Sequence, residues 1–129
     1  ADGRYLRYIG IDAPESATFK NPAQCFAKEA TARNKELVEN KDVIFYQDVS
    51  EKDDYGRQLG FMYLADGTFI NNLLVAEGYA FAYPYKPDIS KQEQFAASEA
   101  SAKIGNLGLW KDCRVAVVNG GRRQTDFAN

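Results

Sequence analysis

Residues 7–15 of the chain have the sequence Arg-Tyr-Ile-Gly-Ile-Asp-Ala-Pro-Glu. Its β-branched and aromatic residues predict a strand over residues 5–11, with Arg7 on it. Asp12 and Glu15 follow the end of this strand in a turn stiffened by proline, so a cation and two carboxylates are held close together. Carboxylates and backbone carbonyls are the ligands that calcium binds. Taken alone, the stretch is explained more simply by solvated charges at a surface strand end.

Two further clusters could carry chemistry. Residues 53–57, Asp-Asp-Tyr-Gly-Arg, contain a glycine that allows an unusual backbone, and Arg57 can clamp a phosphate in bidentate fashion. A hairpin loop with a surface arginine is the simpler interpretation of this cluster in isolation. Residues 83–87, Tyr-Pro-Tyr-Lys-Pro, hold two tyrosines in a rigid loop, where they could stack on bases or bind a phosphate. The tyrosines could equally pin the loop to the core.

The composition narrows the chemistry that is available. The 129 residues suit a single domain, and the net charge of -2 indicates that any contact with nucleic acid is local rather than spread along a basic surface. The chain has no histidine, which excludes Ser-His-Asp and Cys-His catalysis and histidine-bound zinc. Cys25 and Cys113 are too far apart for a CxxC motif and are either two buried thiols or one disulfide. No apolar run approaches the length of a membrane span, so we expect no membrane association.

Strands and helices are expected to follow each other irregularly, which indicates an α+β domain. Asn21 is expected to cap a helix whose first residue is proline, and the turn residues Asp2 and Gly3 predict a hairpin before the first strand. The expected strands cover residues 5–11, 43–46, 59–64 and 79–83, and the expected helices cover residues 22–38, 70–77 and 90–105.

The order and spacing of the motifs are more informative than any one of them. Residues 7–15, Asp-Tyr-Gly-Arg at 54–57, the helix of Asn71, residues 83–87 and Gly-Leu-Trp at 108–110 together resemble the staphylococcal nuclease (thermonuclease) family. The resemblance implies an OB-fold, a five-stranded Greek-key barrel, with three packed helices. It also implies calcium-dependent hydrolysis of phosphodiester bonds in DNA and RNA, leaving 3′-phosphate products.

The resemblance implies a role for each charged residue. Arg7 and Arg57 match two arginines that bind the scissile phosphate. Asp12 matches a calcium-ligating aspartate, and Ala13 matches a residue that offers its backbone carbonyl to the metal. Glu15 matches a glutamate that orients or deprotonates the attacking water. These roles suit phosphodiester hydrolysis, which needs a water molecule oriented in line with the scissile bond and neutralisation of the charge on the phosphoryl oxygens.

The same resemblance extends to the substrate pocket and the cysteines. Tyr83 and Tyr85 match tyrosines that line the nucleotide pocket, and we group Tyr55 with them as substrate-binding. Asp54 falls where a lysine would contact the nucleotide, so that contact is not expected here. In the family's fold the regions of the two cysteines lie on one flank, which favours a disulfide between Cys25 and Cys113.

One departure from the family pattern affects the metal site. The family has two strands before the strand of Arg7, which carry Asp-Gly-Asp-Thr with a further metal ligand, and this sequence starts after that region. Residues 1–113 are therefore expected to form an N-terminally incomplete nuclease-like domain, followed by a tail over residues 114–129. An alternative is that the tail folds back as a hairpin through residues 119–121 and replaces the missing strands.

These observations lead to two function hypotheses from different classes. The first is a calcium-dependent nuclease, secreted or periplasmic and monomeric. The second is a catalytically inactive nuclease-like module that binds nucleic acid or protein. The presence of all four charged residues, Arg7, Asp12, Glu15 and Arg57, favours the first, and the missing aspartate favours the second. A plain OB-fold ligand module would leave these four positions unexplained.

Overall fold

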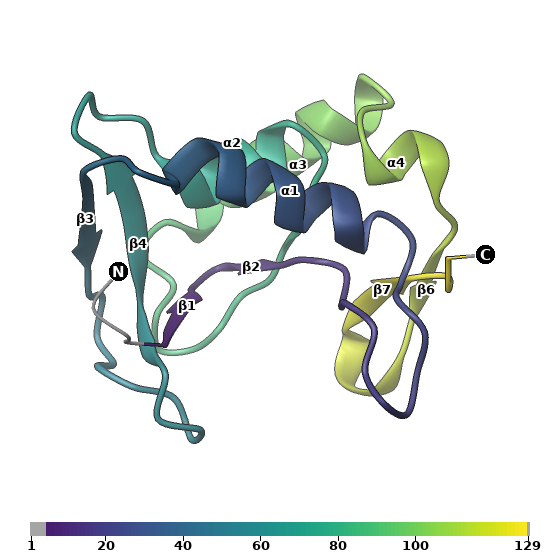
Figure 1. The fold of residues 1–129 in the computed structure, drawn as a ribbon, viewed down its shortest axis with the longest axis horizontal. Coiled ribbons are helices and arrows are strands. Elements are labelled where there is room, and N and C mark those ends of the chain that lie inside the picture. The colour runs from purple at the N-terminus through teal and green to yellow at the C-terminus, as the bar shows by residue number, and fades with distance from the viewer. Residues whose placement is uncertain (1–4, 129) are drawn as a thin grey trace.

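The computed structural model describes residues 5–128 and shows an α+β domain (Figure 1). The turn predicted at Asp2 and Gly3 lies outside these residues. The helices are α1 (Ala27–Val38), α2 (Ile70–Ala76), α3 (Gln92–Ile104) and α4 (Leu109–Asp112). The strands are β1 (Leu6–Tyr8), β2 (Ile11–Asp12), β3 (Val43–Tyr46), β4 (Gln58–Leu64), β5 (Phe81–Ala82), β6 (Val115–Val117) and β7 (Arg123–Thr125). The expectation of three helices was therefore short by one, because the chain makes a further turn of helix at α4.

The strands of the described residues form three separate sheets. β4 pairs with β1 in parallel and with β3 in antiparallel orientation, β2 pairs with β5, and β6 pairs with β7. Within residues 5–128 these sheets do not join into a closed barrel, so the five-stranded OB-fold stays a prediction. Figure 1 shows the helices gathered along one side, with the β1–β4–β3 sheet at one end and the β6–β7 hairpin at the other.

The hydrophobic core fixes the end of the sheet against the helices. Ile9, Leu59 and Phe95 are almost fully buried in one cluster with residues of α2. Asn71 of α2 is also fully buried; its side-chain oxygen accepts from the Met62 N–H at 2.9 Å, and its amide nitrogen donates to the Ile9 carbonyl at 3.0 Å. The helix is thereby joined to β4 and to the residue that follows β1 through hydrogen bonds that water cannot reach.

The strand expected over residues 5–11 is divided by a turn at Gly10. This glycine has a φ of 83°, and a Cβ atom there would collide with the ring of Phe95. The turn lets the chain change partners, since β1 pairs with β4 whereas β2 pairs with β5. The prediction of one continuous strand was wrong because the run of apolar residues does not reveal where the partner changes.

The first helix begins at Ala27 rather than at the predicted Asn21 cap. The segment before it has other hydrogen bonds: the Gln24 side-chain oxygen accepts from the Glu15 N–H at 2.8 Å, and the Cys25 N–H donates to the Asp126 carbonyl at 2.6 Å. Tertiary hydrogen bonds thus keep this segment out of the helix despite its favourable capping residues.

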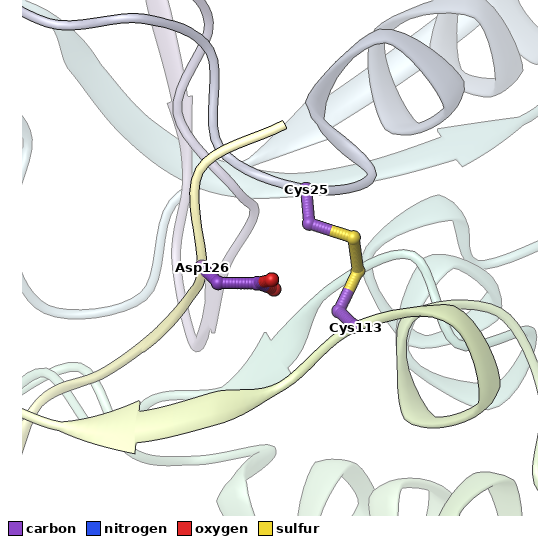
Figure 2. A group of neighbouring side chains, drawn as sticks. All are labelled: Cys25, Cys113 and Asp126. Atoms are coloured by element: carbon purple, nitrogen blue, oxygen red, sulfur yellow. A yellow bond between two sulfur atoms is a disulfide. The ribbon is translucent and has the colours of Figure 1, made fainter. Parts of the chain in front are cut away.

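The tail forms the expected hairpin, with residues 119–121 at its turn. Its strands pair with each other and not with β1 or β4, so the idea that the tail replaces missing barrel strands was wrong. The predicted disulfide is confirmed: Cys25 and Cys113 are bridged, with their Cα atoms 5.8 Å apart (Figure 2). None of the helices in residues 5–128 is long and apolar enough to cross a membrane.

Candidate active site

The parallel register of β1 and β4 brings two arginines to one end of the sheet. Leu6 lies opposite Gln58, and the Gln58 N–H donates to the Tyr5 carbonyl at 2.9 Å. Arg57, which directly precedes β4, is therefore placed next to the start of β1, two positions from the level of Arg7. Residues 50 apart in sequence thus enter one cleft through strand pairing.

Arg7 is held by the backbone of its own turn. Its guanidinium donates to the Tyr8 carbonyl at 2.7 Å and to the Ile11 carbonyl at 2.9 Å. Burial lowers the pKa of Arg7; the charge of Asp12 opposes this shift, and the nearby cations Arg57 and Arg122 reinforce it. An arginine with so high an ordinary pKa stays protonated at neutral pH. The fold therefore holds a fixed positive charge in a partly dehydrated position.

Arg57 is positioned by Asp53, a residue that sequence reasoning did not assign to a role. The Arg57 Nε donates to the Asp53 carboxylate at 2.6 Å, and the same carboxylate accepts the backbone N–H groups of Tyr55 and Arg57, both at 2.9 Å. Burial raises the pKa of Asp53, but these hydrogen bonds outweigh burial and leave the pKa below its ordinary value. Among the described residues no hydrogen-bond acceptor contacts the two terminal guanidinium nitrogens, so they are free to bind an anion.

Asp12 and Glu15 line the same cleft as the two arginines. Asp12 lies on β2, opposite Phe81 of β5, and its side chain is only 10% exposed. The Glu15 side chain is 57% exposed, and the backbone of Glu15 is fixed by hydrogen bonds in both directions with Gln24. The pair therefore combines one buried carboxylate with one that solvent can reach.

Arg122, from the turn of the β6–β7 hairpin, lies between these two carboxylates. Its Nε donates to Asp12 Oδ2 at 2.9 Å, and its Nη2 lies 3.2 Å from both Asp12 Oδ1 and Glu15 Oε1. These contacts, those with Asp12 above all, raise the pKa of Arg122. Arg122 directly follows the turn of the predicted hairpin, but nothing in the sequence shows that this turn faces the cleft.

The loop over residues 83–88, which carries Tyr83 and Tyr85, is bonded to the turn after β1 and to the segment that follows β3. The Tyr83 N–H donates to the Gly10 carbonyl at 2.8 Å, which links the loop to the turn after β1. Asp88 is 1% exposed and accepts the N–H groups of Val49 and Ser50 at 2.8 and 2.7 Å. The loop is thereby fixed against the segment that leads to Arg57.

One cleft of about 560 Å³ collects every residue that the sequence pointed to in this region. Asp54 also lines it, so a carboxylate stands where the resemblance would place a lysine. The lining residues with a predicted role are Arg7, Asp12, Ala13, Glu15, Tyr55, Arg57, Tyr83 and Tyr85. Their roles in binding or chemistry stay predictions, whereas their common location is a property of the structure.

The donor set of the cleft suits a hard cation. Asp12 and Glu15 supply carboxylate oxygens beside Ala13, and the pair already attracts the guanidinium of Arg122. Within the described residues, the one group of three possible metal-binding side chains is Cys25, Cys113 and Asp126, and its sulfur atoms are bonded to each other (Figure 2). That group is therefore not a thiolate metal site, and the cleft is the better candidate.

Comparison with known proteins agrees with the resemblance. The family model described as staphylococcal nuclease homologue matches residues 5–112, and the chain belongs to this family. It is 35% identical over 107 residues to a thermonuclease of Staphylococcus hyicus, an alignment that covers 83% of this chain and 63% of the relative. It is also 35% identical to the endonuclease YncB of Bacillus subtilis (strain 168), over 81% of this chain and 50% of the relative. The chain thus spans about half to two thirds of the length of these relatives.

Proposed function

We propose that the protein is a calcium-dependent nuclease that hydrolyses phosphodiester bonds in DNA and RNA and leaves 3′-phosphate products. The observation that carries the proposal is the meeting of two guanidinium groups and two carboxylates, Arg7, Arg57, Asp12 and Glu15, in one cleft. Relatives named thermonuclease and endonuclease support the same reaction class.

In this proposal the positive charges bind the phosphate and stabilise its transition state. Arg7 offers a guanidinium fixed by two backbone carbonyls, and Arg57 offers the two nitrogens that Asp53 does not use. Such preorganised charges act on the oxygens where negative charge develops. Calcium, held by Asp12 and the Ala13 carbonyl, would add positive charge at the phosphate.

Glu15 is the proposed group for handling water. Its exposed carboxylate can accept a proton from a water molecule or orient that water toward phosphorus. The tyrosines Tyr55, Tyr83 and Tyr85 line the cleft and would stack on bases or contact the nucleotide. A stacking site without base-specific hydrogen bonds would accept both DNA and RNA.

The disulfide supports a secreted or periplasmic location for the protein. The Cys25–Cys113 bridge persists best in an oxidising compartment, because cytosolic thiol systems keep most cysteines reduced. We further propose that the protein acts as a monomer, because one chain by itself supplies all four charged residues of the proposed reaction.

An inactive binding module is the second candidate. It is favoured by the contact of Arg122 with Asp12 and Glu15, because that contact occupies the carboxylates that catalysis would need.

A paired measurement on Glu15→Gln separates the two candidates. We expect wild-type protein to cleave a fluorescent single-stranded DNA in calcium. Glu15→Gln should bind this DNA with an affinity, measured by fluorescence anisotropy, close to that of wild type, but should cleave it at least about 100-fold more slowly. Equal binding without cleavage by either protein would support the module instead. A collapse of binding with unchanged turnover would show that Glu15 is a binding residue.

A further inference from the structure

The contact between Arg122 and the acidic pair is specific in its geometry. The guanidinium engages both carboxylate oxygens of Asp12 and one oxygen of Glu15. Bidentate pairs of arginine and carboxylate are among the stronger charge-assisted interactions in proteins. The Arg122 side chain is 44% exposed, whereas that of Asp12 is 10% exposed, so a partly buried carboxylate is neutralised by an arginine that solvent can reach.

The hairpin that carries Arg122 is seated firmly on the domain. The adjacent Arg123 makes a two-pronged contact with Glu99 of α3 at 2.8 Å and donates to the Ala82 carbonyl at 2.8 Å. Its guanidinium also lies 5.0 Å from the ring centre of Phe81. The backbone at Arg122 is therefore fixed by its neighbour, and its side chain is directed to the acidic pair.

A second attachment holds the base of the hairpin. The Thr125 hydroxyl donates to the Cys25 carbonyl at 2.7 Å, and the disulfide joins Cys25 to the residue that precedes the hairpin. Figure 2 shows the Asp126 side chain beside this disulfide, and its carboxylate accepts the Arg114 N–H at 3.0 Å. Two independent attachments thus place Arg122 in the cleft.

We propose that Arg122 is the resident cation of the metal site and sets its affinity for divalent cations. A cation that binds Asp12 and Glu15 must displace the guanidinium from the same oxygens. The affinity of the site for metal is therefore lower than it would be without Arg122. A metal ion that binds replaces the guanidinium and does not enter an empty site. This inference rests on the proposed function, because it concerns the same acidic pair.

Removal of the guanidinium should strengthen metal binding. Hydrogen bonds to charged groups contribute enough to change an equilibrium constant by about ten- to a hundredfold. We expect Arg122→Gln, which retains a polar side chain, to bind calcium more tightly than wild type by about this factor. Arg122→Lys keeps the charge but loses the fork and should lie between the two.

The experiment is calorimetric titration of each variant with calcium alone, without nucleic acid. Arg114→Gln is the matched control, because it removes the same charge from the base of the same hairpin at an exposed position outside the cleft. We expect its calcium affinity to differ from wild type by less than about twofold, the size of a long-range, screened charge effect. Circular dichroism confirms folding, and Arg122→Lys carries the test if Arg122→Gln does not fold.

The outcomes separate this inference from the proposed function. Tighter binding by Arg122→Gln, with Arg114→Gln unchanged, supports the inference. Equal affinity of wild type and both Arg122 variants overturns it and leaves a metal-dependent nuclease intact. An equal gain in Arg122→Gln and Arg114→Gln also overturns it, because net charge would then explain the change. Absence of calcium binding by every variant overturns both the inference and the calcium dependence of the proposed reaction.

Discussion

Arg57 combines a structural contact with a proposed role in the reaction. Its Nε is bonded to Asp53, which also closes the backbone turn before β4 through the N–H groups of Tyr55 and Arg57. The remaining nitrogens lie on the cleft that Arg7 enters from β1. A planar group fixed at one edge presents its other donors with a defined direction, and a lysine cannot do so.

Arg57→Lys should therefore lower turnover while the protein remains folded. Loss of a preorganised donor to a developing charge costs about 10²–10³ in rate. The measurement is kcat on single-stranded DNA in calcium, with the melting temperature as a control on folding. Turnover close to that of wild type would place Arg57 outside the reacting phosphate.

The limits of sequence prediction are clear at the level of single residues. Arg7, Asp12 and Glu15 lie within one short stretch, so local reasoning could bring them together. Arg122 meets Asp12 across 110 positions, and that contact depends on the hairpin being seated by Arg123 and Glu99. No periodicity or turn signal encodes such a docking, which is why the residue that contacts both carboxylates was missed.

At the scale of elements, the sequence predicted the strands β3 and β4 better than it predicted junctions between elements. The strand Val43–Tyr46 and the bounds of β4 were predicted within a residue, because each is a short continuous run of apolar and aromatic residues. The turn at Gly10 and the late start of α1 were missed, since both depend on partners far along the chain. A closed barrel was expected from the family resemblance alone. The described strands pair in separate sheets, so closure of a barrel stays a prediction.

Asn71 joins α2 to β4 and to the residue that follows β1, and its removal should destabilise the whole domain. In Asn71→Ala the Met62 N–H and the Ile9 carbonyl lose a buried partner. Each buried polar group left unpaired costs about 1–3 kcal/mol, so the two groups together give an expected loss of about 2–6 kcal/mol. Denaturant unfolding measures it.

The neighbouring Asn72→Ala is the matched control for this substitution. Asn72 accepts one hydrogen bond, from the Ser98 hydroxyl, in a partly buried position. We expect a loss of only about 1 kcal/mol for that variant. Similar losses in the free energy of unfolding for the two variants would contradict the claim that the buried hydrogen bonds of Asn71 stabilise the domain more than that of Asn72.

At the scale of the whole molecule, the disulfide joins the segment before α1 to the residue that follows α4. Cys25 and Cys113 are 88 positions apart, so the bridge closes a long loop of the unfolded chain. The chain-entropy estimate for a loop of this length is about 4–5 kcal/mol. The bridge thus adds to the contacts that seat the hairpin on the domain.

Reduction of the disulfide should lower the melting temperature clearly while activity at low temperature changes little. Neither bridged cysteine lies on β1 or β4, the strands beside the proposed catalytic arginines, and Arg123 still anchors the hairpin to Glu99. Calorimetry with and without reductant measures the shift. Two thiols that titrate in the unfolded, unreduced protein would show that the bridge is absent.

The central claim is that the cleft hydrolyses phosphodiester bonds with the help of a divalent cation. The most direct measurement is the rate of cleavage of single-stranded DNA in calcium, then in excess chelator, then with calcium restored. Because Asp12 and Glu15 are the proposed cation-binding groups of the cleft, we predict cleavage that stops with chelator and returns with the metal. Undiminished cleavage in excess chelator would contradict the claim.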